Sequence, residues 1–180
     1  MNEVRLHRLL LSGATFAALA VAMVLVKLLP LGLGAGGWPV PDLLMCLLVA
    51  WMIRRPDLLP MPLVAVVFLW ADLMLMRPPG LWAAVAVLAG EWLRNRQRSL
   101  RAAPLLAEPG LLAALMVAMV LAHWAVLAVL FVDQPRLGQQ LLQVPVTVLA
   151  YPAVAGLLQI GLGLRRRPVI EGFGRRAARP

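Results

Sequence analysis

Long apolar runs, separated by short clusters of arginine, recur along the whole chain and constrain its fold more than any other feature. A helix that crosses a hydrocarbon core of about 30 Å needs about 20 consecutive apolar residues. Hydrophobic residues make up 62% of the 180 residues, whereas soluble domains are about 45–50% apolar. A single soluble core of this size cannot hide so much apolar surface. The sequence therefore predicts an all-α integral membrane protein.

Six apolar segments are candidates for transmembrane helices, so we expect a bundle of about six. Their approximate bounds are 9–29, 40–53, 61–76, 80–93, 110–132 and 140–164. The first, fifth and sixth are long enough to span a bilayer. The second, third and fourth are short, which leaves open whether they span it fully or shelter inside the bundle. We expect residues 1–164 to form one transmembrane domain and residues 165–180 to form a basic cytoplasmic tail.

The basic residues predict that both ends of the chain lie in the cytoplasm. Cytoplasmic segments of membrane proteins carry an excess of Lys and Arg. With the N-terminus inside, the only exceptions among the 17 basic residues are Lys27, Arg77 and Arg136. This placement explains the net charge of +9 without a nucleic-acid partner, because no aromatic platform accompanies the arginines. We interpret residues 94–101 as a topology anchor, with contact to membrane lipids or a cytoplasmic partner as the functional alternative.

A small set of ionisable residues lies within or beside the apolar segments. Asp72 lies in the third segment and His123 in the fifth, while Lys27 and Asp42 stand on the outer side of the first two. A charge inside the membrane costs at least about 2.5–3.5 kcal/mol, so each should face the bundle and have a partner. We expect these four residues to form a polar cluster in the outer leaflet. An ion-pair or hydrogen-bond cluster is the simplest interpretation; proton transfer, substrate binding and contact with another protein's helix remain alternatives.

The sixth segment carries polar side chains on a single face. Gln143, Thr147 and Tyr151 recur at four-residue spacing, which aligns them on one side of a helix. Pro145 and Pro152 would kink that helix. We predict hydrogen bonds to a neighbouring helix, with a ligand-lined kink as the alternative.

Small residues and one acidic residue indicate further helix contacts. Glu91 stands beside Arg94 and should form an interfacial ion pair with it. Alanines at four-residue spacing mark two faces on which another helix can approach closely. They are Ala14, Ala18 and Ala22 in the first segment, and Ala114, Ala118 and Ala122 in the fifth. Whether the approaching helix belongs to this chain or to a partner is left open.

Sequence motifs of enzymes and metal sites are absent. The only histidines are His7 and His123, and neither serine, Ser12 or Ser99, lies at the depth of His123. The single cysteine, Cys46, excludes an intrachain disulfide and a cysteine metal cluster. We therefore expect a protein that is not an enzyme, with no catalytic, cofactor-binding or metal-binding residues.

An ordered set of residues between positions 38 and 95 matches a known pattern. It runs from Pro41-Asp42-Leu43-Leu44 through Trp51 and Arg55-Pro56-Asp57 to Phe68-Leu69-Trp70-Ala71-Asp72-Leu73 and Pro79-Gly80-Leu81. This order resembles the MreD family of rod-shape-determining membrane proteins. The matching positions are Asp42, Trp51, Pro56, Asp72 and Gly80. One departure is Phe68, which stands where the family often has a glycine about one turn before the acidic residue.

The resemblance implies a structural role in the bacterial inner membrane. Members of the family are multi-pass scaffold subunits of the wall-elongation complex. They bind MreC and thereby connect MreB, indirectly, to RodA and its penicillin-binding transpeptidase. The family is also similar in fold to the substrate-binding subunits of energy-coupling-factor transporters, so a subunit of a vitamin transporter is the alternative function.

The resemblance also implies roles for single residues. Trp51 should anchor the inner membrane interface. Pro56 and Gly80 should shape turns. Asp72 should orient the third helix or contact a partner.

Overall fold

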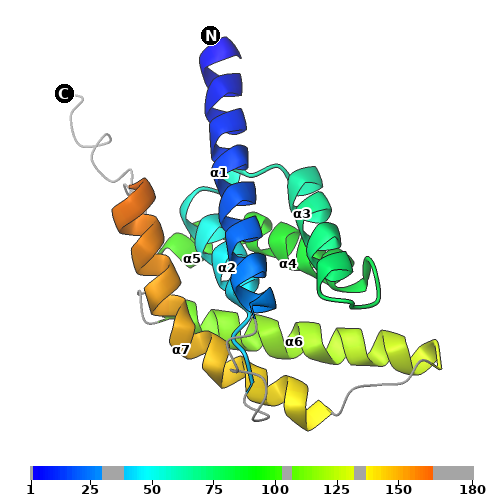
Figure 1. The fold of residues 1–180 in the computed structure, drawn as a ribbon. Helices are drawn as coiled ribbons and strands as arrows, with labels where there is room; N and C mark the ends of the chain where they lie inside the picture. The colour runs from blue at the N-terminus through cyan, green and yellow to red at the C-terminus, as the bar shows by residue number, and fades with distance from the viewer. Residues whose placement is uncertain (1, 30–38, 103–106, 132–136, 164–180) are drawn as a thin grey trace.

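The structure is a computed structural model that describes residues 2–29, 39–102, 107–131 and 137–163. The described residues form helices and no strand (Figure 1). The predictions for Arg136 and for the tail 165–180 lie outside them. The elements are α1 (Asn2–Leu28), α2 (Leu43–Arg54), the 3₁₀ helix η1 (Pro56–Leu58), α3 (Met61–Met74), α4 (Leu81–Asn95), α5 (Gln97–Ala102), α6 (Ala107–Val129) and α7 (Leu137–Leu162).

The all-helical fold class is confirmed, and each of the six predicted apolar segments corresponds to one helix. Three helices are long and apolar enough to cross a membrane, namely α1 over Leu6–Leu28, α6 and α7. The apolar helices α2 and α3 are shorter. The short helix α5 lies in the basic stretch 94–101, where no helix was predicted from the sequence. The length and composition of these three helices are consistent with a membrane protein.

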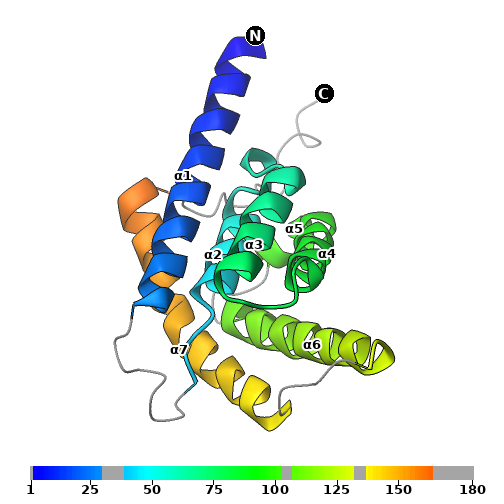
Figure 2. The same cartoon turned by 45° about the vertical axis from the view of Figure 1, so that its right-hand side comes forward.

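Helix α2 forms the centre of the molecule. Its residues from Leu44 to Arg54 are all buried, and it packs against α1, α4, α5 and α7. Figures 1 and 2 show it enclosed by longer helices. A helix that is apolar on all sides belongs in a protein core. The burial of α2 among other helices explains its shortness, because it does not have to span the bilayer on its own outer surface.

Contacts between side chains show how α1 and α7 run relative to α2. Phe16 of α1 packs edge-on against Trp51 near the end of α2, with ring centroids 5.4 Å apart. At the start of α2, Asp42 bonds to Thr147 of α7, while Tyr151 one turn later reaches Arg54. We therefore speak of the Asp42 end and the Arg54 end of the molecule.

The helices do not stand as parallel rods. In both views α6 lies at a steep angle to α1, while α7 runs obliquely beside α2 (Figures 1 and 2). Helix α6 packs on α7 and α4. Its direction is therefore set by those two helices.

Two turns are shaped by residues with restricted or unusual backbone preferences. Pro56 is buried and begins η1 directly after α2. Gly80 precedes α4 with a φ of 86°, a left-handed conformation that glycine adopts without steric cost. Phe68, the departure from the family pattern, is fully buried in α3, so its ring fills space that a glycine would leave to an approaching helix.

Candidate functional site at the two ends of helix α2

Asp42 joins three elements at its end of the molecule. Its carboxylate oxygen Oδ1 accepts a hydrogen bond from the backbone N–H of Met45 at 3.2 Å and so caps α2. Its own backbone N–H donates to Thr147 Oγ1 on α7 at 2.9 Å. Its second oxygen lies 3.9 Å from Arg77 Nη1, in the turn between α3 and α4. The residue is 4% exposed, so the carboxylate holds helices together inside the protein.

Asp72, on α3, caps the start of the neighbouring helix α4. Its Oδ2 accepts hydrogen bonds from the backbone N–H groups of Gly80 at 3.2 Å and Ala83 at 3.1 Å. Those N–H groups belong to the first turn of α4, where a helix has donors without internal partners. The positive end of the helix dipole also favours a carboxylate there. Asp72 therefore fixes the α3–α4 turn.

Arg77, His123 and Lys27 complete the charge arrangement at the Asp42 end. The Arg77 guanidinium lies over the Trp82 ring at 5.4 Å, and His123 meets that ring edge-on with centroids 5.5 Å apart. His123 lies within electrostatic range of Asp72 and Arg77, and Lys27 lies within range of Asp42 and Arg77. Arg77, which the sequence analysis left in an outer loop without a role, connects the residues predicted to gather here.

The polar face of α7 points at α2 and its flanks. Gln143 donates through Nε2 to the carbonyl of Val40 at 2.9 Å, and Thr147 receives the Asp42 N–H described above. Tyr151 reaches the opposite end of α2. The predicted hydrogen bonding from this face to a neighbouring helix is confirmed.

A buried ion pair, which the sequence analysis missed, lies at the Arg54 end. Arg54 Nη1 lies 3.4 Å from Glu108 Oε2 and donates to Tyr151 OH at 3.5 Å and to the Ala50 carbonyl at 3.2 Å. The Tyr151 hydroxyl in turn donates to Glu108 Oε2. Arg54 is 1% exposed and Glu108 4%. The predicted segments 40–53 and 110–132 left both Arg54 and Glu108 outside the apolar runs. The signal that could have found the pair is a single carboxylate directly before a long apolar run.

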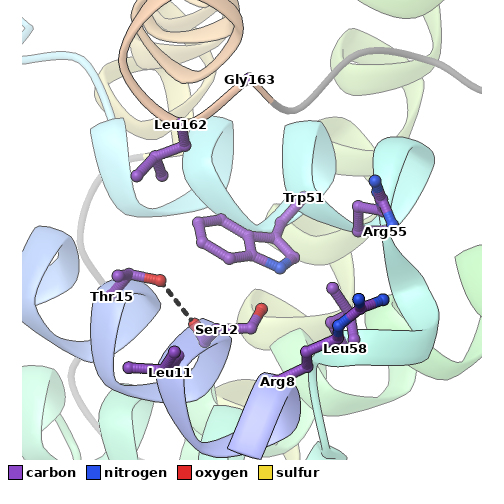
Figure 3. A pocket seen from close by; sticks show the side chains of 9 residues that line it. All are labelled: Arg8, Leu11, Ser12, Thr15, Trp51, Arg55, Leu58, Leu162 and Gly163. Carbon is purple, nitrogen blue, oxygen red and sulfur yellow. Dashed lines mark hydrogen bonds between the residues drawn. The ribbon is translucent and has the colours of Figure 1, made fainter. Parts of the chain in front are cut away.

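A cavity of about 340 Å³ opens beside the same end of the molecule (Figure 3). It lies between α1, the end of α2, η1 and the end of α7. Its lining residues are Arg8, Leu11, Ser12, Thr15, Trp51, Arg55, Leu58, Leu162 and Gly163. Three buried polar atoms of these residues have no hydrogen-bond partner among the described residues: Ser12 Oγ, Trp51 Nε1 and Arg55 Nε.

Trp51 requires a correction. The resemblance implied that it anchors the membrane interface, but the side chain is 1% exposed and packs on Phe16. Trp92, by contrast, is 40% exposed near the end of α4, where Arg96 lies over its ring at 5.0 Å. The physical reason is the central position of α2, which places the Trp51 ring among other helices and not on the outer surface of the bundle.

The predicted ion pair between Glu91 and Arg94 is confirmed, with Arg94 Nη1 and Glu91 Oε1 3.4 Å apart. Arg94 also donates to the Leu59 carbonyl at 2.6 Å, which ties α4 to the turn before α3. In the part of the chain that the structure describes, no group of three or more His, Cys, Asp or Glu side chains is placed to hold a metal ion.

In comparisons with known proteins, no family model, no curated protein and no solved structure matches the chain.

Proposed function

We propose that this chain is a non-catalytic scaffold subunit of the bacterial cell-wall elongation complex, with six crossings of the inner membrane and both ends in the cytoplasm. In this role it binds MreC and couples MreB, indirectly, to RodA and its transpeptidase. The resemblance of residues 38–95 suggests the complex. The structural observation that carries the scaffold role is a pair of alanine faces, on α1 and α6, that no other described residue covers.

Both predicted alanine faces point away from the rest of the described chain. Every member of the two sets is exposed, namely Ala14, Ala18 and Ala22 on α1 and Ala114, Ala118 and Ala122 on α6. Small side chains let two helix backbones approach closely in a membrane, where packing rather than water drives association. The sequence left open whether the helix that approaches these faces belongs to this chain or to a partner. Because the faces are exposed, that helix would come from outside the described residues.

The use of the buried polar groups also supports a scaffold. Asp42 and Asp72 accept backbone N–H groups at the starts of α2 and α4, and Arg54 pairs with Glu108. Each of these contacts either caps the start of a helix or joins two helices. A substrate-binding subunit of a vitamin transporter, the alternative, would need such outer polar groups to turn toward a small ligand. At the Asp42 end, one oxygen of each carboxylate instead accepts hydrogen bonds from backbone donors.

The experiment is affinity purification of the tagged chain from its own host in a gentle detergent, with co-purifying proteins identified by mass. We expect a single-span protein with a coiled coil outside the membrane, with or without the glycosyltransferase. An ATPase pair with a coupling membrane subunit would contradict the proposal and favour the transporter. Recovery of neither set would also contradict it.

Bulky substitutions on the alanine faces sharpen this test. We expect Ala18→Leu or Ala118→Leu to lower partner recovery about tenfold, because added side-chain volume separates the two helix backbones and a loss of about 1.4 kcal/mol is tenfold in affinity. The matched control is Ala153→Leu, which changes an exposed alanine on α7 outside both faces. Equal recovery for all three variants would show that the alanine faces are not the contact.

A further inference from the structure

We propose that the cavity beside Trp51 is a binding site for the phosphate-bearing headgroup of an anionic phospholipid. The proposal goes beyond the scaffold role and does not depend on it, because it concerns the chain alone in its membrane. It rests on three observations: hydrogen-bond donors without partners, a surplus of positive charge, and the position of the cavity at the ends of two spanning helices.

The donors that face the cavity come from three different elements. The Trp51 side chain is 1% exposed, yet its indole Nε1 has no hydrogen-bond partner among the described residues. Figure 3 shows the indole at the centre of the cavity, with its ring nitrogen turned toward Ser12 and Leu58. Ser12 Oγ and Arg55 Nε are buried and likewise without partners in the described chain. Buried donors normally have acceptors, so these three atoms around one cavity indicate an acceptor that the described residues do not provide.

The cavity carries two positive charges and no negative one among its lining residues. Arg8 comes from α1 and Arg55 from the turn after α2, and the nine lining residues include no Asp or Glu. Neither guanidinium forms an ion pair within the described part of the chain. Arginine presents a planar set of donors that matches the oxygens of a phosphate. The chemistry of the site therefore selects a phosphate group.

The position of the cavity selects a lipid as the source of that phosphate. Arg8 lies near the beginning of the spanning segment Leu6–Leu28, and Leu162 ends the spanning helix α7. The ends of spanning helices lie at the level of lipid headgroups. Apolar side chains from Leu11, Leu58 and Leu162 line the same cavity and suit the first carbons of an acyl chain. Arginine pockets between helices on the cytoplasmic side are a known mode of anionic-lipid recognition.

The test measures lipid binding by the purified full chain. The protein is stripped of lipid in detergent and titrated with phosphatidylglycerol, with phosphatidylcholine and with inorganic phosphate, and bound molecules are counted by native mass spectrometry. We expect phosphatidylglycerol to bind with higher affinity than phosphatidylcholine. Inorganic phosphate should neither bind at the same concentrations nor compete. Equal binding of the two lipids would overturn the proposal, and competition by inorganic phosphate at similar concentrations would overturn the lipid source.

Charge-removing variants locate the binding. We expect Arg8→Gln with Arg55→Gln to weaken phosphatidylglycerol binding about 30-fold, from about 1 kcal/mol per basic residue at a lipid surface. The control is Arg96→Gln, which removes a charge from an exposed side chain outside the cavity lining and should change binding less than threefold. If the first pair does not fold, Arg8→Lys with Arg55→Lys replaces it. This variant keeps both charges but loses the planar guanidinium donors. It should therefore bind phosphatidylglycerol several-fold more weakly than the unchanged chain. Wild-type binding by the folded variant would overturn the proposal.

Discussion

The two ends of helix α2 hold their charges in different ways. At the Asp42 end, the carboxylates of Asp42 and Asp72 accept hydrogen bonds from backbone N–H groups at helix starts. At the Arg54 end, two adjacent arginines differ from each other. Arg54 is buried and paired with Glu108, while Arg55 keeps a donor without a partner beside a cavity.

The difference shows which polar groups are used by folding and which remain for binding. Backbone donors at helix starts have fixed positions, so a carboxylate that satisfies them is committed to the fold. A side-chain ion pair that is buried on both sides is committed in the same way. Donors that line a cavity and have no acceptor in the described chain are the groups left for a ligand. Asp72 Oδ1, Trp82 Nε1 and His123 Nδ1 at the Asp42 end are also buried without partners among the described residues. The cavity lined by Arg8 and Arg55 is what places the proposed lipid site at the Arg54 end.

The largest expected effect comes from breaking the buried ion pair. We predict that Glu108→Ala lowers the free energy of unfolding by about 4 kcal/mol, because it leaves the Arg54 charge buried without its carboxylate. Thermal unfolding of the purified protein in detergent measures this, with Glu3→Ala at an exposed carboxylate as the control. A loss equal to that of the control would show that the ion pair is not structural and would remove the contrast between Arg54 and Arg55.

A smaller effect is expected at the Asp42 end. We predict that Asp72→Ala lowers the free energy of unfolding by about 3 kcal/mol, because the N–H groups of Gly80 and Ala83 lose their acceptor. Asp72→Asn retains a carbonyl acceptor and should cost only about 1 kcal/mol. The same unfolding assay compares the two variants. If Asp72→Ala left stability unchanged but reduced partner recovery, Asp72 would be a partner contact and not a cap.

The sequence predicted the helices well because apolar length is a local property. Each of the six apolar segments corresponds to one helix. The spacing of Gln143, Thr147 and Tyr151 correctly predicted the face of α7 that bonds to other elements. Alternation of helix direction also placed Lys27 and Asp42 within reach of each other's charge. These inferences need only the period of a helix and the order of segments.

The sequence did not predict contacts that depend on which helix lies at the centre. Arg54 looked like a loop charge, because nothing local shows that Glu108 and Tyr151 meet it at the buried end of α2. Trp51 looked like an interfacial anchor for the same reason. The steep angle between α1 and α6 was also beyond local patterns, since crossing angles follow from the side chains at each helix contact.

The most direct test of the whole account is the side of the membrane on which each end of the molecule lies. Single cysteines replace Pro79, before α4, and Ser99, in α5 after it, both of which are exposed. They are treated in intact cells with a reagent that does not cross the membrane. The unchanged chain is the control, because its one cysteine, Cys46, is buried. The account predicts that Pro79→Cys is labelled in intact cells and that Ser99→Cys is labelled only after the cells are opened. Labelling of both positions, or of Ser99→Cys alone, in intact cells would contradict the account.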